Sequence, residues 1–512
     1  MMMKRSSARR VWGALAAAAV GALLLSACGG GGSGPAPSSS GEAGEPGGTV
    51  KVLLAAQPAT LDPIVGARSG QVVWATMLEP LIVTDPDLEL TDAGIITSWE
   101  RTDETTWTFG VRPDVEFSNG EKADAAAVAN TILLSRDAER SQLKSYFGNV
   151  ESAEATDATT VVVKTKLPQY NIADLLTTVY LVPPAYYAEV GTEGFALEPI
   201  GTGPYVLDEV KAGQSIAVVA NEDYWGDQPL NDGIVYTWAN EAAQRLALVQ
   251  SKAVDIALDL PPVQADQAES AGLEVIRTTT AMKIIAFLDS TKAPFDDPQL
   301  REAAALAIDR DAIVSGIFDG QAEADGGLLN VRPGQEPAEI VTADPDAAAE
   351  LVSGSPAVQI HYPAAQYTNI KEVAEAVGGS LEQAGFTVSY EATDYGTLVG
   401  RVIGREVPGI SIFAGVPNVA TPDFFASGFM KSASITGNCP DPTIDEMVAT
   451  ALQQESDEAA AEIYEELNTM GVVEKHCYVP LYRQIFNIAT QPSVQGVVFG
   501  PLNTLNLTKT TL

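Results

Sequence analysis

Strand-like and helix-like patterns alternate along the chain, and this alternation limits the possible fold more than any other feature of the sequence. A first strand is expected at Thr49–Leu54, and a strand rich in β-branched residues at 159–165. Trp107, Phe109 and Val111 alternate with polar residues, as in a half-buried strand. This arrangement is typical of the α/β class. The chain after residue 48 is longer than one ordinary core, so two or more domains are expected.

Aspartates mark the clearest helix starts. Asp297 and Asp441 are each followed by a proline, and Asp124 precedes an apolar helical pattern. Aspartate is a preferred N-cap and proline is preferred at the first helical position. A longer helix is expected near residues 457–474.

Residues 1–27 have the pattern of an export signal. Basic residues precede an apolar stretch at 11–25, which is too short to span a bilayer. The stretch ends in Leu25-Ser26-Ala27-Cys28, where small residues precede a cysteine as in a lipoprotein signal. We expect cleavage before Cys28 and lipidation of its thiol. The alternative is an ordinary signal peptide with a chance cysteine.

Residues 28–48 are rich in glycine, serine and proline, and this composition predicts a flexible tether. A diacylated Cys28 would hold the protein to a membrane through two chains, which suffices for stable anchoring. The predicted location is therefore extracytoplasmic, lipid-anchored to the cell membrane.

The chain is strongly acidic, with a formal net charge of −37. Removing Lys4, Arg5, Arg9 and Arg10 with the signal would take this charge to −41. Such a surface repels nucleic acid and anionic lipid headgroups. We therefore expect no nucleic-acid partner, membrane contact through the lipid anchor only, and a monomeric body.

Two cysteines remain once Cys28 is acylated. In an oxidising compartment Cys439 and Cys477 are expected to form a disulfide. The alternative is a metal site that uses both thiols with His361 and His476. No close ligand pair such as Cys-x-x-Cys supports it.

Motifs of known catalytic sites are missing from the sequence. It contains no Gly-x-Ser-x-Gly, His-Glu-x-x-His or phosphate-binding loop. The Gly-Thr-Gly-Pro-Tyr segment at 201–205 lacks a third glycine and leads into a strand-like run, unlike a dinucleotide site. We therefore predict a protein that is not an enzyme and needs no cofactor or metal. A secreted hydrolase is the alternative.

A series of short motifs runs in order along most of the chain. The motifs are Leu-Asp-Pro at 61–63, Glu-Pro-Leu at 79–81, Trp99-Glu100 followed by Phe-Ser-Asn-Gly at 117–120, Gly-Thr-Gly-Pro-Tyr at 201–205, Asn-Glu-Asp-Tyr-Trp-Gly at 221–226, Pro-Phe-Asp-Asp-Pro at 294–298 with Arg301, and Ala-Ile-Asp-Arg at 307–310. Together they resemble the family 5 extracellular solute-binding proteins, the peptide, dipeptide and nickel importer group.

The resemblance implies a two-lobed periplasmic-binding-protein-like clamp of type II, similar to cluster C. Lobe 1 would hold residues 49–283 and 485–512, with an extra subdomain at 84–198, and lobe 2 residues 284–484. It also implies the substrate-binding lipoprotein of an ABC importer, which captures a peptide-like or other small solute and delivers it to permease subunits. The alternative is a lipid-anchored sensor or chaperone-like binding protein without transport.

The resemblance also places ligand-binding residues. In peptide-binding members two extended segments pair with the ligand backbone. The matching residues here are Gly66, Ala67, Arg68 and Ser69 in lobe 1, and Ala414, Gly415 and Val416 in lobe 2. The alternative for both segments is an ordinary loop or strand. Tyr482 matches an aromatic residue of the pocket, with core packing as its alternative.

Asn418 stands where peptide-binding members have an aspartate that holds the ligand α-ammonium. A buried ammonium without a counter-charge is costly. We therefore predict that an unmodified peptide is not the tightest ligand, unless Asp394 or Asp423 supplies the charge. Arg401 and Arg405 lie near the positions of cations that bind the ligand carboxylate in the family, although ordinary surface roles explain them equally well.

Overall fold

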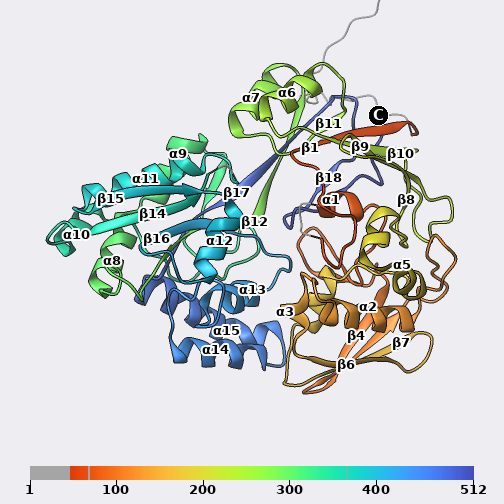
Figure 1. Cartoon of the computed structure of the whole chain (residues 1–512), viewed down its shortest axis with the longest axis horizontal. Coiled ribbons are helices and arrows are strands. Elements are labelled where there is room, and N and C mark those ends of the chain that lie inside the picture. The colour runs from red at the N-terminus through yellow and green to blue at the C-terminus, as the bar shows by residue number, and fades with distance from the viewer. Residues whose placement is uncertain (1–45, 67–69, 365) are drawn as a thin grey trace, which may run out of the picture. The chain divides into compact units, whose positions relative to one another are not determined.

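An 11-stranded mixed sheet, with β15 at one end and β8 at the other, is the largest sheet of the described residues (Figure 1). The computed structural model describes residues 46–66, 70–364 and 366–512. The predicted signal peptide, nearly all of the tether and Cys28 lie outside these residues. The strands follow the order β15 (Thr387–Thr393), β14 (Ala357–Pro363), β16 (Ile410–Gly415), β12 (Glu274–Leu288), β17 (Tyr478–Thr490), β11 (Ile256–Ala257), β1 (Thr49–Leu54), β10 (Gly233–Trp238), β9 (Ser215–Ala220) and β8 (Tyr205–Lys211), and β13 (Ala322–Ala324) pairs with β17.

Strands β12 and β17 are the longest, with 15 and 13 residues, and they pair antiparallel. Strands β16, β14 and β15 follow on one side of this pair, and β11, β1 and the remaining strands on the other. The pairing is irregular between Thr279 and Lys283, and again between Ile284 and Ile285. The lobe boundaries predicted between residues 283 and 284 and between residues 484 and 485 fall within these two strands.

Helices cover both faces of the sheet around β12. Ile284 and Ala286 belong to a core with α8 (Pro298–Ala307) and α11 (Ile370–Gln383). Ile285 and Phe287 belong to a second core with α14 (Pro442–Leu452) and α15 (Asp457–Asn468). Successive side chains of a strand point to opposite faces, so β12 serves both cores. The apolar strands therefore have the pattern of a sheet buried on both sides.

The aspartates predicted to start helices do so. Asp124 caps α2 (Ala125–Asp137), Asp297 caps α8 and Asp441 caps α14, each accepting from backbone N–H groups. Helix α15 continues as a π-helical turn, Thr469–Glu474. The other helices are α1 (Gln71–Trp74), α3 (Lys144–Phe147), α4 (Ile172–Leu175), α5 (Pro184–Leu197), α6 (Ala242–Gln250), α7 (Pro262–Ser270), α9 (Arg310–Phe318), α10 (Pro345–Leu351), α12 (Tyr395–Ile403) and α13 (Asp423–Phe425).

A second sheet lies within the predicted subdomain. Its order is β4 (Ile96–Asp103), β5 (Thr106–Val111), β7 (Thr160–Thr165) and β6 (Val150–Ala155). Trp107 and Phe109 of β5 are buried in its core, as their alternation predicted. Two short hairpin-like pairs complete the sheets: β2 (Val83–Thr84) with β3 (Leu90–Thr91), and β18 (Val498–Phe499) with β19 (Leu505–Asn506). Among the described helices, none has the length and apolarity to cross a membrane.

Several residues of the family-like motifs hold the scaffold together. The Asp62 carboxylate accepts hydrogen bonds from the Ile64 N–H (2.8 Å) and the Tyr187 hydroxyl (2.7 Å). Arg301 and Arg310 donate to backbone carbonyls, including that of Pro480, 2.6 Å from Arg310 Nε. These side chains satisfy buried polar groups of the fold.

Glu79 joins two of the motifs. Its carboxylate accepts from the Tyr224 hydroxyl (2.8 Å) and the Trp225 Nε1 (2.7 Å). Burial raises its pKa, against the hydrogen bonds that favour the charged form. The Glu-Pro-Leu segment and the Asp-Tyr-Trp segment are therefore fastened to each other through this one side chain.

We expect Glu79→Ala to reduce the free energy of unfolding by about 2–3 kcal/mol, because two half-buried donors lose a charged acceptor. Urea unfolding followed by tryptophan fluorescence measures the change. Glu100→Ala, an exposed acid on β4, is the control and should change stability by less than about 0.5 kcal/mol. Equal effects of the two substitutions would contradict a fastening role for Glu79.

Candidate functional site

The predicted ligand segment of lobe 2 begins at the end of β16. Ala414 and Gly415 pair with Ile284 and Lys283 of β12. On the other side, the strand pairing of β16 with β14 includes only Ile410 and Ser411 among the described residues. Val416, which follows Gly415, is half-buried. The described pairing with β14 therefore ends at Ser411, before the predicted ligand segment at 414–416.

Gly415 and Gly66 both lie where a side chain does not fit. A Cβ on Gly415 would come 2.3 Å from the Phe425 ring, and one on Gly66 would come 2.5 Å from the Trp74 ring. The close approach of these rings is a sufficient reason for glycine at both positions, whether or not either residue contacts a ligand. The other residues of the predicted lobe 1 segment, Ala67, Arg68 and Ser69, lie outside the described residues.

Asn418 is half-buried in the loop that follows β16. Asp394 caps α12 and accepts from the Thr397 N–H (2.9 Å). Asp423 is buried, accepts from the Ser427 hydroxyl (2.5 Å), and has its pKa raised by burial. Each of the two aspartates considered as a replacement charge thus already has a local hydrogen-bonding role.

The remaining predicted ligand residues have partners within the protein. Tyr482 is 1% exposed and its ring packs against Phe318, with centroids 4.7 Å apart, in line with the core-packing alternative. Arg401 donates to Glu391 (2.6 Å). Arg405 donates to two backbone carbonyls of the loop before Cys439, those of Ser434 and Ile435.

Cys439 and Cys477 form a disulfide with their Cα atoms 6.0 Å apart, which confirms the predicted pair. Both residues are buried. The metal site considered as the alternative is wrong, because neither thiol is free. His361 lies 3.1 Å from Glu391, and burial lowers its pKa, which favours the neutral imidazole.

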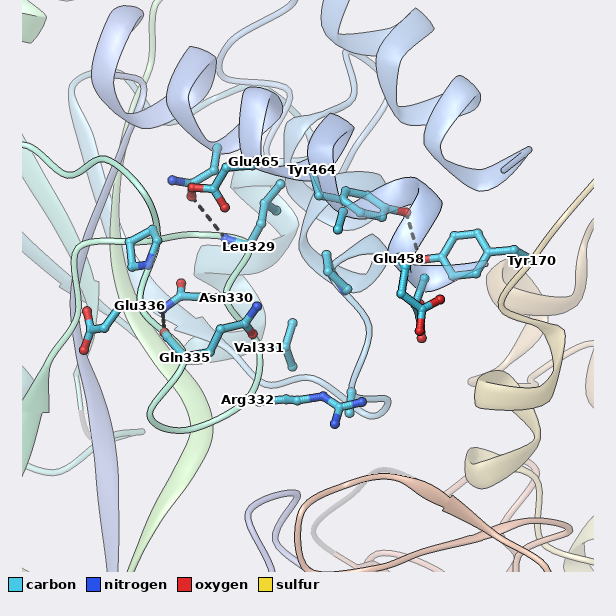
Figure 2. Close-up of a pocket in the computed structure, with 16 residues that line it drawn as sticks. Tyr170, Leu329, Asn330, Val331, Arg332, Gln335, Glu336, Glu458, Tyr464 and Glu465 are labelled. Carbon is cyan, nitrogen blue, oxygen red and sulfur yellow. Dashed lines mark hydrogen bonds between the residues drawn. The ribbon is translucent and has the colours of Figure 1, made fainter. Parts of the chain in front are cut away.

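A cavity of about 280 Å³ is lined in part by residues of the loop that follows β16 (Figure 2). It includes Tyr170 from the predicted subdomain and residues of the predicted lobe 2. None of the predicted ligand residues lines it, although Ala420 and Pro422 follow Asn418 closely. Its walls are Tyr170, Leu329, Asn330, Val331, Arg332, Gln335, Glu336, Pro337, Ala420, Pro422, Asp457, Glu458, Ala461, Tyr464, Glu465 and Asn468.

Contacts on both sides of the cavity join the predicted subdomain to the predicted second lobe. The hydroxyls of Tyr170 and Tyr464 are 3.4 Å apart. Arg332 forms an ion pair with Glu89. The cavity was missed from the sequence because its walls come from segments far apart in the chain. The only local sign was the predicted helix near 457–474, which provides one wall.

A buried charge network supports another wall of the cavity. Lys283 and Arg483 face each other across β12 and β17. The Asp325 carboxylate lies 3.1 Å from Lys283 Nζ and 2.8 Å from Arg483 Nε. Lys283 also donates to Asn330 (2.5 Å), and Arg483 donates to the Val331 carbonyl (2.8 Å). The network therefore ties the loop that carries Asn330 and Val331 to the two longest strands.

The protonation of this network follows from its burial and its charges. Although burial acts to raise the pKa of Asp325, the two cations hold it below its usual value. Burial lowers the pKa of Lys283, against the attraction of Asp325. The ring of Phe425 lies 5.5 Å from Lys283 Nζ and adds a favourable cation–π contact.

The fold defines a class, the two-lobed periplasmic binding proteins. The substrate-binding protein CtaP from Listeria monocytogenes superposes with a TM-score of 0.82 at 18% identity, covering 91% of this chain and 100% of CtaP. NikA from Brucella suis in complex with Fe(III)-EDTA superposes with a TM-score of 0.81 at 20% identity, covering 91% and 99%. The predicted α/β clamp fold is confirmed.

The sequence narrows the class to a family. Residues 92–437, more than half of the chain, match the model of the bacterial extracellular solute-binding proteins, family 5 Middle. The chain belongs to the bacterial extracellular solute-binding proteins of family 5, as the motifs predicted.

Curated relatives with similar sequences carry names of peptide-type binding proteins. A probable di/tripeptide-binding protein 5 of Pseudomonas aeruginosa is 25% identical over 59% of this chain and 60% of its own length. The glutathione-binding protein GsiB of Escherichia coli is 28% identical over 55% and 56%. Both alignments span less than two thirds of the relative's length.

Proposed function

We propose that this protein is the substrate-binding lipoprotein of an ABC importer. It would capture a peptide-like or other small solute between two lobes, 49–283 with 485–512 and 284–484, and deliver it to a membrane permease. The observation that carries the proposal is family 5 membership together with the clamp fold. In such an importer ATP would be hydrolysed by other subunits. The binding protein itself would therefore need no catalytic residue.

Binding and delivery would be coupled through the lobes. A solute that touches both lobes only when they are closed binds that state more tightly, so it shifts the population toward closure. Strands β12 and β17 run between the two sets of strands and are the natural site of bending. The closed form would then differ from the open form in the surface that it presents to a permease.

Native mass spectrometry of the purified protein, followed by small-angle scattering with the recovered compound, tests the proposal. The expected result is a co-purified solute, and a smaller radius of gyration when that solute is added back to stripped protein. A tight ligand that produces no compaction would refute the clamp mechanism. Chromogenic ester, peptide and glycoside substrates check the hydrolase alternative, and turnover of any of them would contradict the assignment.

Anchoring is expected to depend on Cys28. Cys28→Ala removes the only thiol in the Leu-Ser-Ala-Cys segment, so the variant should appear in the medium or remain as unprocessed precursor. Immunoblots of membrane and medium fractions measure this, with Ser26→Ala as the control that keeps the cysteine. Normal processing and membrane retention of the Cys28 variant would contradict the lipid anchor.

The ligand class is expected to depend on Asn418. Asn418→Asp should tighten binding of a free tripeptide by about tenfold, because a charge-assisted hydrogen bond to the α-ammonium is stronger than a neutral one. The N-acetylated tripeptide, which has no ammonium, should gain nothing. Calorimetric titration of both peptides into both proteins gives the comparison. Nanomolar binding of ordinary peptides by the unaltered protein, lost on acetylation, would show that Asn418 does not limit peptide binding.

A further inference from the structure

The cavity that includes Ala420 and Pro422 has more carboxylates than cations among its lining residues. Arg332 is the one cation among the described residues that line it, and it is already paired with Glu89. In the described part of the chain, no lysine or arginine lies within ion-pair distance of the four carboxylates in the walls. Those carboxylates belong to Glu336, Asp457, Glu458 and Glu465.

A buried polar atom also lacks a partner in the wall of the cavity. Asn468 is 2% exposed, and its Oδ1 accepts from the N–H groups of Leu328 (2.8 Å) and Leu329 (3.3 Å). Its Nδ2 has no hydrogen-bond partner among the described residues. An unsatisfied buried donor costs about 1–3 kcal/mol, so an acceptor oxygen on a bound molecule would be stabilised here.

The rest of the lining suits an apolar chain with a cationic end. Figure 2 shows the Tyr170 and Tyr464 hydroxyls meeting beside Glu458, with Asn330, Val331 and Arg332 on the facing loop. Tyrosine rings attract cations, and aliphatic walls accept the methylene stem of a long charged side chain. The volume, about 280 Å³, is slightly below the usual 300–1,000 Å³ of a complete small-molecule site.

We infer that this cavity is a recognition site for one cationic alkyl group of the solute, a guanidinium or an ammonium on an apolar stem. The carboxylates of Glu458 and Glu465 neutralise the cation, and Asn468 Nδ2 donates to a carbonyl oxygen near the base of the stem. The inference rests on the proposed function, because it assigns to the cavity one part of a solute bound between the lobes. It adds a charge preference that the extended segment at 414–416 does not provide.

The experiment compares the dipeptides Ala-Arg and Ala-citrulline, which have nearly the same shape and differ in one positive charge. Calorimetric titration at low salt is expected to show a preference for Ala-Arg of about tenfold or more, since charged hydrogen bonds are about twice as strong as neutral ones. The variant Glu458→Gln with Glu465→Gln should lose this preference. The matched control, Glu462→Gln with Glu466→Gln, removes two exposed charges from the same helix outside the cavity and should keep it.

Equal binding of the two dipeptides, absence of binding by both, or a preference that survives Glu458→Gln with Glu465→Gln would overturn the inference. A preference lost equally in the control pair would also overturn the inference, because the net charge of the protein would then explain the preference for Ala-Arg. Thermal unfolding of each variant establishes that it is folded before titration. The proposed function is judged separately by the co-purified solute and its compaction, so a failed charge preference with normal compaction rejects only the cationic site.

Discussion

Asp325→Ala is expected to lower the free energy of unfolding by about 3–5 kcal/mol, because it leaves buried cations without their counter-charge. Lys283 is fully buried and Arg483 is 1% exposed, and both lie within 3.1 Å of the Asp325 carboxylate. Like charges that face each other across strands repel. The Asp325 carboxylate therefore stabilises β12, β17 and the loop after β13 together.

Guanidinium unfolding at neutral pH measures this effect, and two controls define its cause. Glu323→Ala removes a more exposed acid 4.0 Å from Arg483 and should cost less than about 1 kcal/mol. Adding Lys283→Met to Asp325→Ala should recover part of the loss, since the repulsion disappears. No recovery, with a loss as small as that of Glu323→Ala, would contradict the charge argument.

The loss of stability caused by Asp325→Ala should also depend on pH. The cations lower the pKa of Asp325 in the folded protein from its ordinary value of 3.8. Its stabilisation is therefore complete above that ordinary value and disappears as the pH falls through the lower folded value. The unaltered protein and Asp325→Ala should approach each other in stability only in strong acid.

Replacing both Cys439 and Cys477 by alanine is expected to cost about 4 kcal/mol. The disulfide joins residues 38 apart, and in the chain-entropy model a loop of that length restricts the unfolded chain by about this amount. Unfolding midpoints with and without dithiothreitol provide the measurement. The reductant should shift the unaltered protein toward the variant and leave the variant unchanged. A midpoint in the variant equal to that of the oxidised protein would contradict the prediction.

Local features of the fold could be predicted from the sequence because they depend on neighbouring residues. Asp124, Asp297 and Asp441 cap helices through N–H groups only two or three residues away, and such short-range chemistry is visible in the chain. The Cys439–Cys477 pair could be predicted because the sequence contains only one other cysteine, Cys28, which was assigned to the predicted lipid anchor. The family resemblance supplied the clamp fold, which local patterns do not specify.

The site was less predictable because its residues meet through long-range packing. Lys283, Asp325 and Arg483 lie in three separate segments, and no spacing in the sequence indicates that they converge. Tyr482 has the motif position of a pocket residue but faces Phe318 in a core. Motif residues such as Asp62 and Glu79 hold the scaffold, so the resemblance defines the fold more closely than the solute.

The irregular pairing of β12 with β17 has a mechanical consequence. A fully regular two-stranded ribbon resists bending along its length, whereas a missing stretch of ladder bonds, such as that between Thr279 and Lys283, makes one short section compliant. In the proposed clamp mechanism, the two strands would bend at this section while the register on either side is kept. Amide hydrogen exchange should accordingly be faster at residues 280 and 282 than in the flanking pairs, and slow at Ala281, whose N–H donates to the Pro501 carbonyl (2.9 Å).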